Sequence, residues 1–204
     1  VWTEAESALE NVLKNNDLDF EINPADAAFY GPKLDFYVKD SLNREFQCAT
    51  VQLDFQLPER FDLTYASASG NMERPVVIHR ALYGSFERFI GIIIEHYAGA
   101  FPTWLAPVQC VIMTISERFV AYAEEVHNLL KSQQIRVELD NRDDKIGAKI
   151  RDARLQQIPY MFIIGEREVE NRTVSVRVRE EGDIGAMDLN VAVERVCAEA
   201  DVDF

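Results

Sequence analysis

Cysteine is scarce in this chain of 204 residues, and long apolar runs are missing. The three cysteines, Cys48, Cys110 and Cys197, lie far apart and form no Cys-x-x-Cys pair. An odd number of distant cysteines argues against a disulfide framework and indicates a reducing compartment, which we expect to be the cytoplasm. The longest apolar run is too short to cross a bilayer, and the N-terminus lacks the pattern of a signal peptide. We therefore expect no contact with a membrane.

Basic residues are also few compared with acidic ones. Lys and Arg number 21 against 35 Asp and Glu, so the net charge is −14. No overall positive field draws such a chain to nucleic acid, and any contact of that kind must come from a local basic patch. The hydrophobic share of 48% is enough for a buried core, and the length suggests one or two domains.

A short segment around Gly84 links a strand-like stretch at 74–79 to a strongly apolar run at 89–94. Glycine allows a backbone to approach a flat or charged ligand closely. The apolar run predicts a buried helix, so Arg88 at its start needs a partner. A phosphate or a base plane suits a guanidinium. An ion pair with an acidic side chain would be a purely structural solution, and the residues alone leave both open.

A predicted strand at 45–55 carries an unusual number of polar side chains, and with a shorter strand at 34–38 it predicts an antiparallel hairpin. Alternation along the long strand assigns side chains to two faces. One face holds Cys48, Thr50, Gln52 and Asp54, and the other holds Gln47, Val51, Leu53 and Phe55. Polar groups on an interior strand must be hydrogen-bonded. The stripe is therefore either a solvated sheet face or the floor of a small-molecule pocket.

The second half of the chain alternates strands with helices, which predicts an α/β layer with a mostly parallel sheet. A hairpin is expected at 169–179 with its turn at Asn171 and Arg172, and a closing helix at 189–200. Five basic residues gather in one region, where they form either a phosphate-binding patch or a solvated helix face. They are Arg142, Lys145, Lys149, Arg151 and Arg154.

Four motifs carry a family resemblance. They are Phe-Tyr-Gly-Pro-Lys at 29–33, Gln-Cys-Ala-Thr-Val-Gln-Leu-Asp-Phe at 47–55, Ile-His-Arg-Ala-Leu-Tyr-Gly-Ser-Phe-Glu-Arg-Phe at 78–89 and Pro-Thr-Trp-Leu-Ala-Pro-Val-Gln at 102–109. In this order the chain resembles the threonyl-tRNA synthetases, a class IIa family of aminoacyl-tRNA synthetases. The resemblance implies that residues 1–105 form the C-terminal portion of a catalytic domain with motif 3. It implies an anticodon-binding domain at 106–204.

The implied fold is a partial antiparallel sheet with helices, followed by a mixed, mostly parallel α/β domain. The implied activity is ATP-dependent activation of threonine and its transfer to tRNA(Thr), with ATP bound together with Mg, and the full-length relatives are expected to be homodimers. The resemblance assigns roles to single residues. Catalytic roles fall to Arg88, Gln47 and Lys33, and substrate or ATP binding to Tyr30, Gln47, Cys48, Thr50, Gln52, Gly84 and Arg88. His79 matches one of three zinc ligands, and Asp143, Arg151, Glu168 and Arg177 match anticodon-binding positions.

Two residues depart from the family pattern. Ala49 stands where glycine is usual, and Asp143 stands where some relatives carry asparagine. A carboxylate cannot donate a hydrogen bond, so one base contact is in question. Motifs 1 and 2 and the other two zinc ligands are absent, and a catalytic zinc needs about three protein ligands. We therefore interpret the chain as a fragment that does not activate threonine alone.

Two alternatives remain. The chain could be a non-catalytic tRNA-binding accessory protein of synthetase fold, although such a protein would have no reason to keep Gln47, His79 and Arg88 together. It could also be a prolyl- or histidyl-type synthetase, although the strand at 47–55 with His79 matches the threonine pattern.

Overall fold

The structure is a computed structural model that describes residues 2–24 and 26–201. The chain divides into two compact units, Val1–Ile93 and Ile94–Phe204. The division falls inside helix α3 (Phe86–Tyr97). We predict that the boundary between the two synthetase domains lies after residue 105. Compactness alone does not locate a boundary between functional domains, so this position stays a prediction.

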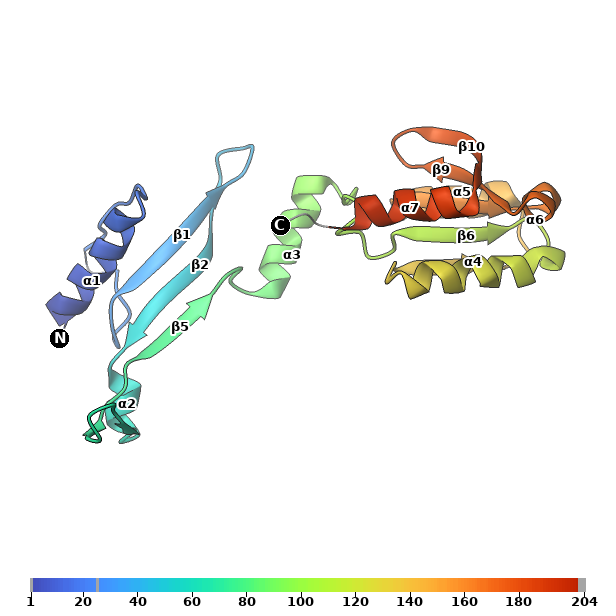
Figure 1. Cartoon of the computed structure of the whole chain (residues 1–204). Helices are drawn as coiled ribbons and strands as arrows, with labels where there is room; N and C mark the ends of the chain where they lie inside the picture. The colour runs from blue at the N-terminus through green and yellow to red at the C-terminus, as the bar shows by residue number, and fades with distance from the viewer. Residues whose placement is uncertain (1, 25, 202–204) are drawn as a thin grey trace. The chain divides into compact units, whose positions relative to one another are not determined.

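The first unit contains an antiparallel sheet in the order β1-β2-β5 (Figure 1). The predicted hairpin is present, and β5 pairs with the free side of β2. The strands are β1 (Lys33–Lys39), β2 (Glu45–Asp54) and β5 (Val77–Ala81), preceded by α1 (Trp2–Asn15). Between β2 and β5, the stretch at 56–73 contains α2 (Gln56–Arg60) and a small hairpin of β3 (Tyr65–Ala66) and β4 (Met72–Glu73).

Helix α3 does not have the burial that its sequence predicts. None of its residues is buried among the described residues, and Phe86 is 74% exposed. Ile90 and Ile94 are also about half exposed, at 48% and 47%. The expectation of a buried helix is therefore wrong for this chain, because the described residues supply no layer that covers it.

The second unit is a five-stranded mixed sheet in the order β10-β9-β8-β6-β7. The strands are β6 (Cys110–Thr114), β7 (Val137–Asp140), β8 (Tyr160–Ile164), β9 (Thr173–Val178) and β10 (Gly182–Asp188). The interior strand β6 is parallel to both neighbours, β8 and β7, whereas β9 is antiparallel to β8 and β10. A mixed sheet was expected, and its parallel part is confined to β7, β6 and β8.

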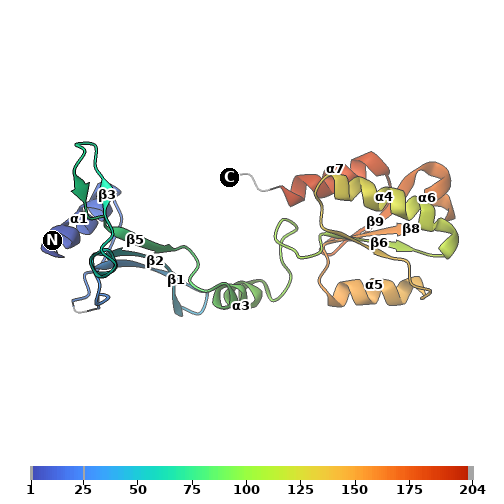
Figure 2. The ribbon, with the colours of Figure 1, turned by 90° about the horizontal axis from the view of Figure 1, so that it is seen from below.

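Helices cover both faces of this sheet. They are α4 (Val120–Ser132), which follows the short 3-10 helix η1 (Glu117–Phe119), α5 (Ile146–Leu155), α6 (Glu166–Asn171) and α7 (Leu189–Ala200). Figure 2 shows α4 and α7 on one face and α5 on the other. Alternate residues of β6 pack against opposite helix layers. Ile112 packs in the core under α4 and α7, and Val111 and Met113 pack in the core under α5. This two-sided burial explains the continuous apolar run of β6.

The hairpin lies later in the chain than predicted. Asn171 ends helix α6, and Arg172 adopts a left-handed conformation at its C-terminus with a φ of 57°. The hairpin is instead formed by β9 and β10, which join at residues 179–181. Asparagine and arginine next to a valine-rich strand fit a turn and a helix end equally well, so the local pattern could not separate the two.

Candidate active-site and anticodon-binding surfaces

An irregularity in the β1–β2 ladder decides which side chains meet. Phe36 pairs with Ala49 and Tyr37 with Gln47, so Cys48 is the extra residue of a β-bulge. Gln47 Nε2 donates to Asp35 Oδ1 at 2.6 Å, and Thr50 also hydrogen-bonds to Asp35. The expectation that Gln47 and Thr50 lie on opposite faces is therefore wrong, because a bulge interrupts the alternation.

Lys33 completes this cluster from the start of β1. Its Nζ lies 2.7 Å from Asp35 Oδ2 and 3.6 Å from Asp26 Oδ1. The hydrogen bond to Asp35 raises the pKa of Lys33 although partial burial opposes it. Burial would raise the pKa of Asp35, but hydrogen bonds from Lys33, Thr50 and Gln47 outweigh it and hold that pKa below its usual range. Both groups are therefore charged at neutral pH.

Tyr30, Gln52 and Thr50 continue the polar face toward β5. The Tyr30 hydroxyl donates to Gln52 Oε1, and Gln52 Nε2 donates to Thr50 Oγ1 at 3.4 Å. Gln52 is the ladder partner of His79, and the Tyr30 and His79 rings have centroids 5.7 Å apart. The sheet thus brings six predicted residues together. They are Tyr30, Lys33, Gln47, Thr50, Gln52 and His79.

Gly31 makes this approach possible. The chain beside it pairs with β2, since Leu53 N donates to Pro32 O at 3.0 Å and Phe55 N donates to Tyr30 O at 3.2 Å. A Cβ at position 31 would lie 1.8 Å from the Leu53 carbonyl oxygen, so only glycine fits without a shift of the backbone.

The remaining predicted residues of the first unit lie outside this hydrogen-bonded cluster. Cys48 is buried, and its carbonyl oxygen lies 3.5 Å from the Cβ that a side chain at Gly84 would have. Gly84 has a φ of 67°, which glycine adopts without strain. Arg88 is exposed, and its backbone N–H donates to Ser85 Oγ at 3.3 Å. Within the described residues its guanidinium has no ion pair, so the structural ion pair considered above is not formed in this part of the chain.

Sequence reasoning missed Asp35, which joins three of the predicted residues. The sequence does show an acidic residue between Leu34 and Phe36 in a short strand. Its contacts depend on how that strand pairs with β2, which the short strand alone does not indicate. Asp54 was identified only as a member of the polar stripe. It is fully buried, and its Oδ2 lies 2.9 Å from His79 Nε2.

The predicted anticodon-binding residues lie at separate places in the second unit. Asp143 follows the carboxyl end of β7, and Glu168 follows the carboxyl end of β8 in helix α6. Arg177 lies on β9 opposite Met161, near the amino end of β8. Arg151 projects from α5 with 74% of its side chain exposed. Glu168 also has a structural contact, because its Oε2 accepts the Gly165 N–H at 2.9 Å.

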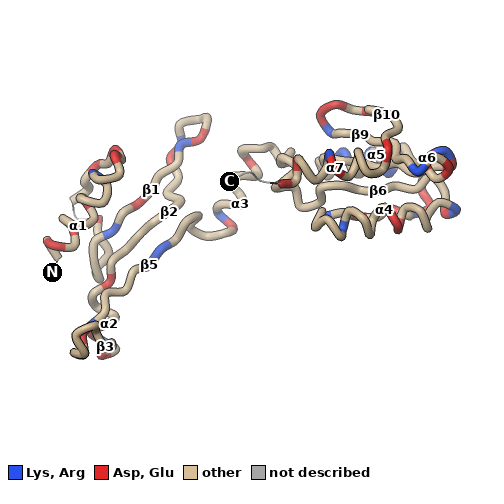
Figure 3. Tube along the Cα trace, viewed as in Figure 1, with Lys and Arg blue, Asp and Glu red and all other residues tan. Residues whose placement is uncertain are grey.

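The predicted basic cluster is only partly available to a ligand. Lys149 is 1% exposed and donates to the carbonyl oxygens of Thr114 and Asp140 at 3.0 and 3.1 Å. Arg142 is bonded to Asp140 and lies 3.2 Å from Asp152. Figure 3 shows acidic residues interspersed with the basic ones around α5 and α6. Arg142, Lys145, Arg151 and Arg154 are exposed, whereas Lys149 is the buried member of the cluster.

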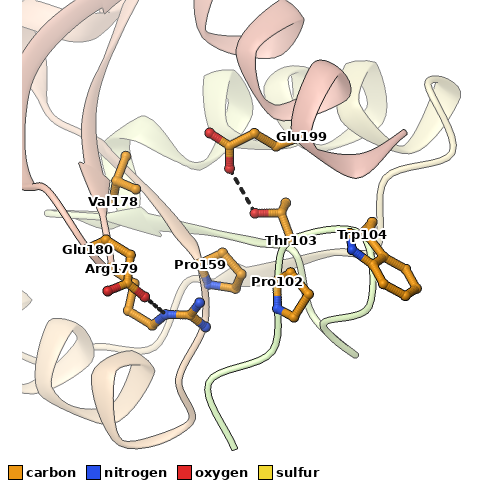
Figure 4. A pocket seen from close by; sticks show the side chains of 8 residues that line it. All are labelled: Pro102, Thr103, Trp104, Pro159, Val178, Arg179, Glu180 and Glu199. Carbon is orange, nitrogen blue, oxygen red and sulfur yellow. Dashed lines mark hydrogen bonds and ion pairs between the residues drawn. The ribbon is translucent and has the colours of Figure 1, made fainter. Parts of the chain in front are cut away.

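A hollow of about 280 Å³ lies elsewhere in the second unit (Figure 4). Its polar groups are already engaged: Thr103 donates to Glu199 at 2.9 Å, and Arg179 donates to Glu180 at 2.7 Å. None of the predicted site residues lines it. No helix among the described residues is long and apolar enough to cross a membrane.

Comparisons with known proteins give matches to both halves of the chain. Residues 1–97 match the class II core domain of tRNA synthetases for G, H, P, S and T, and residues 109–199 match an anticodon-binding domain. The threonine–tRNA ligase of Clostridium tetani is 54% identical over 98% of this chain, which covers 31% of that protein. The corresponding ligase of Caldanaerobacter subterraneus is 53% identical over 97% of the chain, again 31% of its length.

A solved structure is similar as well. The RNA binding domain of threonyl-tRNA synthetase from Cryptosporidium parvum has a TM-score of 0.85 and 40% identity, and the match covers 99% of this chain and 51% of that one. The chain thus spans about a third of the length of the curated relatives it matches. Because both halves match, in the expected order, the chain belongs to the threonyl-tRNA synthetase family, as part of the class II core domain followed by an anticodon-binding domain.

Proposed function

We propose that this chain supplies part of the substrate site and the anticodon-binding domain of a threonine–tRNA ligase. The observation that carries the proposal is the joined polar face of β1 and β2. On this face Lys33, Asp35 and Gln47 form one cluster, and Tyr30 and Gln52 form a second, hydrogen-bonded pair. A face with fixed donors and acceptors is suited to hold a small polar substrate.

Each group has a role in this proposal that its chemistry permits. Tyr30, Thr50, Gln52 and the backbone at Cys48 line the threonine and adenylate site, and Gln47 and Lys33 contact the adenylate. Gly84 leaves room for ATP, which binds with Mg, and the exposed Arg88 guanidinium is free to stack on adenine or pair with phosphate. Threonine, ATP and tRNA(Thr) are the proposed partners. A homodimer and a cytoplasmic location belong to the same proposal.

His79 is proposed as one ligand of a zinc ion that binds the threonine hydroxyl. A metal with an open position can distinguish threonine from isosteric valine, which a purely apolar pocket cannot do well. The half-exposed imidazole suits this role. The described residues contain no group of three His, Cys, Asp or Glu side chains that could hold a metal. A zinc ion would therefore need ligands beyond those that this part of the chain supplies.

The first experiment is binding of this chain to an anticodon stem-loop ending in the threonine anticodon letters G-U, compared with a loop in which those bases are swapped. Both are measured at one stated salt concentration, because phosphate contacts are salt-dependent. We expect binding to the threonine loop to be tighter by about 10- to 100-fold, or roughly 1–3 kcal/mol. Arg151→Ala and Arg177→Ala should remove the preference. Lys131→Ala, an exposed change on α4, should leave it intact.

Equal, weak binding to both loops would contradict the anticodon roles of these residues. Threonine-dependent pyrophosphate exchange by a full-length relative carrying the same residues then separates the alternatives. Loss of exchange in Gln47→Ala and Arg88→Ala supports a substrate site on the first unit. Unchanged exchange would favour an accessory tRNA-binding role for these two domains.

A further inference from the structure

The His79 ring has one of its two nitrogens held by a buried carboxylate. Asp54 has no exposed side-chain surface, and its Oδ2 lies 2.9 Å from His79 Nε2. Its other oxygen, Oδ1, accepts the backbone N–H groups of Gln56 and Leu57 at 2.9 and 3.0 Å. These bonds anchor Asp54 at the start of helix α2, so its position does not depend on His79.

The contact decides where a neutral His79 carries its proton. An ionised carboxylate only accepts hydrogen bonds. Three donors face this carboxylate, namely the backbone N–H groups of Gln56 and Leu57 and the His79 ring, and hydrogen bonds of this kind favour the ionised form. The carboxylate is therefore ionised at neutral pH, and Nε2 must donate. Nδ1 is then left with its lone pair, and within the described residues it has no hydrogen-bond partner.

We propose that Asp54 is a positioning residue that fixes the tautomer and orientation of His79, so that Nδ1 is the atom offered to a ligand. A histidine that binds a metal through one nitrogen commonly donates its other N–H to a carboxylate in this way. The assignment of a zinc ion as that ligand rests on the proposed function. The tautomer itself does not, because it follows from Asp54 alone.

The substitution Asp54→Asn provides the test. The two backbone N–H groups retain the amide oxygen of the new side chain, so its NH₂ group faces His79. Nε2 must then accept, and the proton must move to Nδ1. The measurement is a long-range ¹H–¹⁵N spectrum of this chain at about pH 8, well above the ordinary imidazole pKa of about 6.5. The protonated ring nitrogen lies far upfield of the unprotonated one.

We expect wild-type His79 to be protonated on Nε2 and the Asp54→Asn variant on Nδ1. The matched control is Asp40→Asn. Asp40 also accepts two backbone N–H groups, those of Leu42 and Arg44, but it lies at the far end of the β1–β2 hairpin. The Asp40→Asn substitution should leave the His79 tautomer unchanged, and the signals of His96 and His127 serve as internal references.

An unchanged His79 tautomer in a folded Asp54→Asn variant would overturn the proposal. A wild-type protein with the proton on Nδ1 would overturn it as well, even if the variant did not fold. In the wild type, slow solvent exchange of the His79 Nε2–H compared with that of exposed His96 would support it, whereas equal exchange would contradict it. Failure of stem-loop binding would affect the proposed function and leave this result standing.

Discussion

The Lys149 ammonium group lies 3.0 Å from the Thr114 carbonyl oxygen and ties α5 to the carboxyl end of β6. It also donates to the carbonyl oxygen of Asp140 at 3.1 Å, at the carboxyl end of β7. A residue predicted to contact phosphate is therefore part of the framework. The ends of two parallel strands, which in such sheets border the ligand-binding edge, are held at a fixed separation by one buried side chain.

Lys149→Met should destabilise the second unit. The change keeps most of the apolar volume but leaves two carbonyl groups without their charged donor, at a cost of about 1–3 kcal/mol for each buried group left unpaired. Urea unfolding monitored by circular dichroism measures the loss. Lys131→Met, an exposed change on α4, should shift the midpoint little. Equal midpoints for the two variants would contradict the structural role of Lys149.

Tyr160 should make the second unit sensitive to alkaline pH. Burial raises its pKa, and the hydrogen bond that its hydroxyl donates to Glu199 Oε1 at 2.5 Å raises it further. Because the folded pKa lies above the unfolded value of about 10, this stability is fully present below pH 10 and is lost as the pH rises beyond it. Tyr160→Phe should lower the stability at pH 7 and flatten its decline above about pH 10. The free energies of unfolding of the wild type and of Tyr160→Phe are measured from pH 7 to above pH 10. If the two curves of free energy against pH are parallel, this hydroxyl does not cause the pH dependence.

Glu168 should have two separable roles. Glu168→Ala removes the acceptor for the Gly165 N–H and should cost about 0.5–2 kcal/mol of stability. Glu168→Gln keeps an acceptor oxygen and should stay within about 0.5 kcal/mol of the wild type. Stem-loop binding by the folded Gln variant then tests the anticodon role. If binding is unchanged, the carboxylate serves only to begin helix α6.

Gly31→Ala should disrupt the first unit. The new methyl group would overlap the Leu53 carbonyl, which belongs to the rigid backbone of β2, and overpacking of this kind costs about 1–3 kcal/mol. The displaced segment should also separate Tyr30 from Gln52. Gly91→Ala is the matched control, because nothing lies within 4 Å of its Cβ position in α3. That change should stabilise the helix by about 0.5–1 kcal/mol. Thermal unfolding of both variants gives the comparison, and equal shifts would contradict the argument.

Local patterns were sufficient for much of the fold. Alternation and helical spacing predicted the β1–β2 hairpin and helix α7, because apolar residues recur along these elements with a regular period. Four motifs in a fixed order were enough to identify the threonyl-tRNA synthetase family, which the comparisons then confirmed over both units.

Only the tertiary structure decided how the chemical groups meet. The bulge at Cys48 arises from pairing with β1, so no pattern within β2 could show that Gln47 shares Asp35 with Thr50. The burial of Lys149 depends on carbonyl groups of two other strands. The exposure of α3 depends on whether another segment packs against its apolar residues, which the apolar run itself does not indicate. The sequence by itself determined the identity of the elements and the family, because these follow from local spacing. The positions of charged and polar side chains were decided by contacts between segments far apart in the chain.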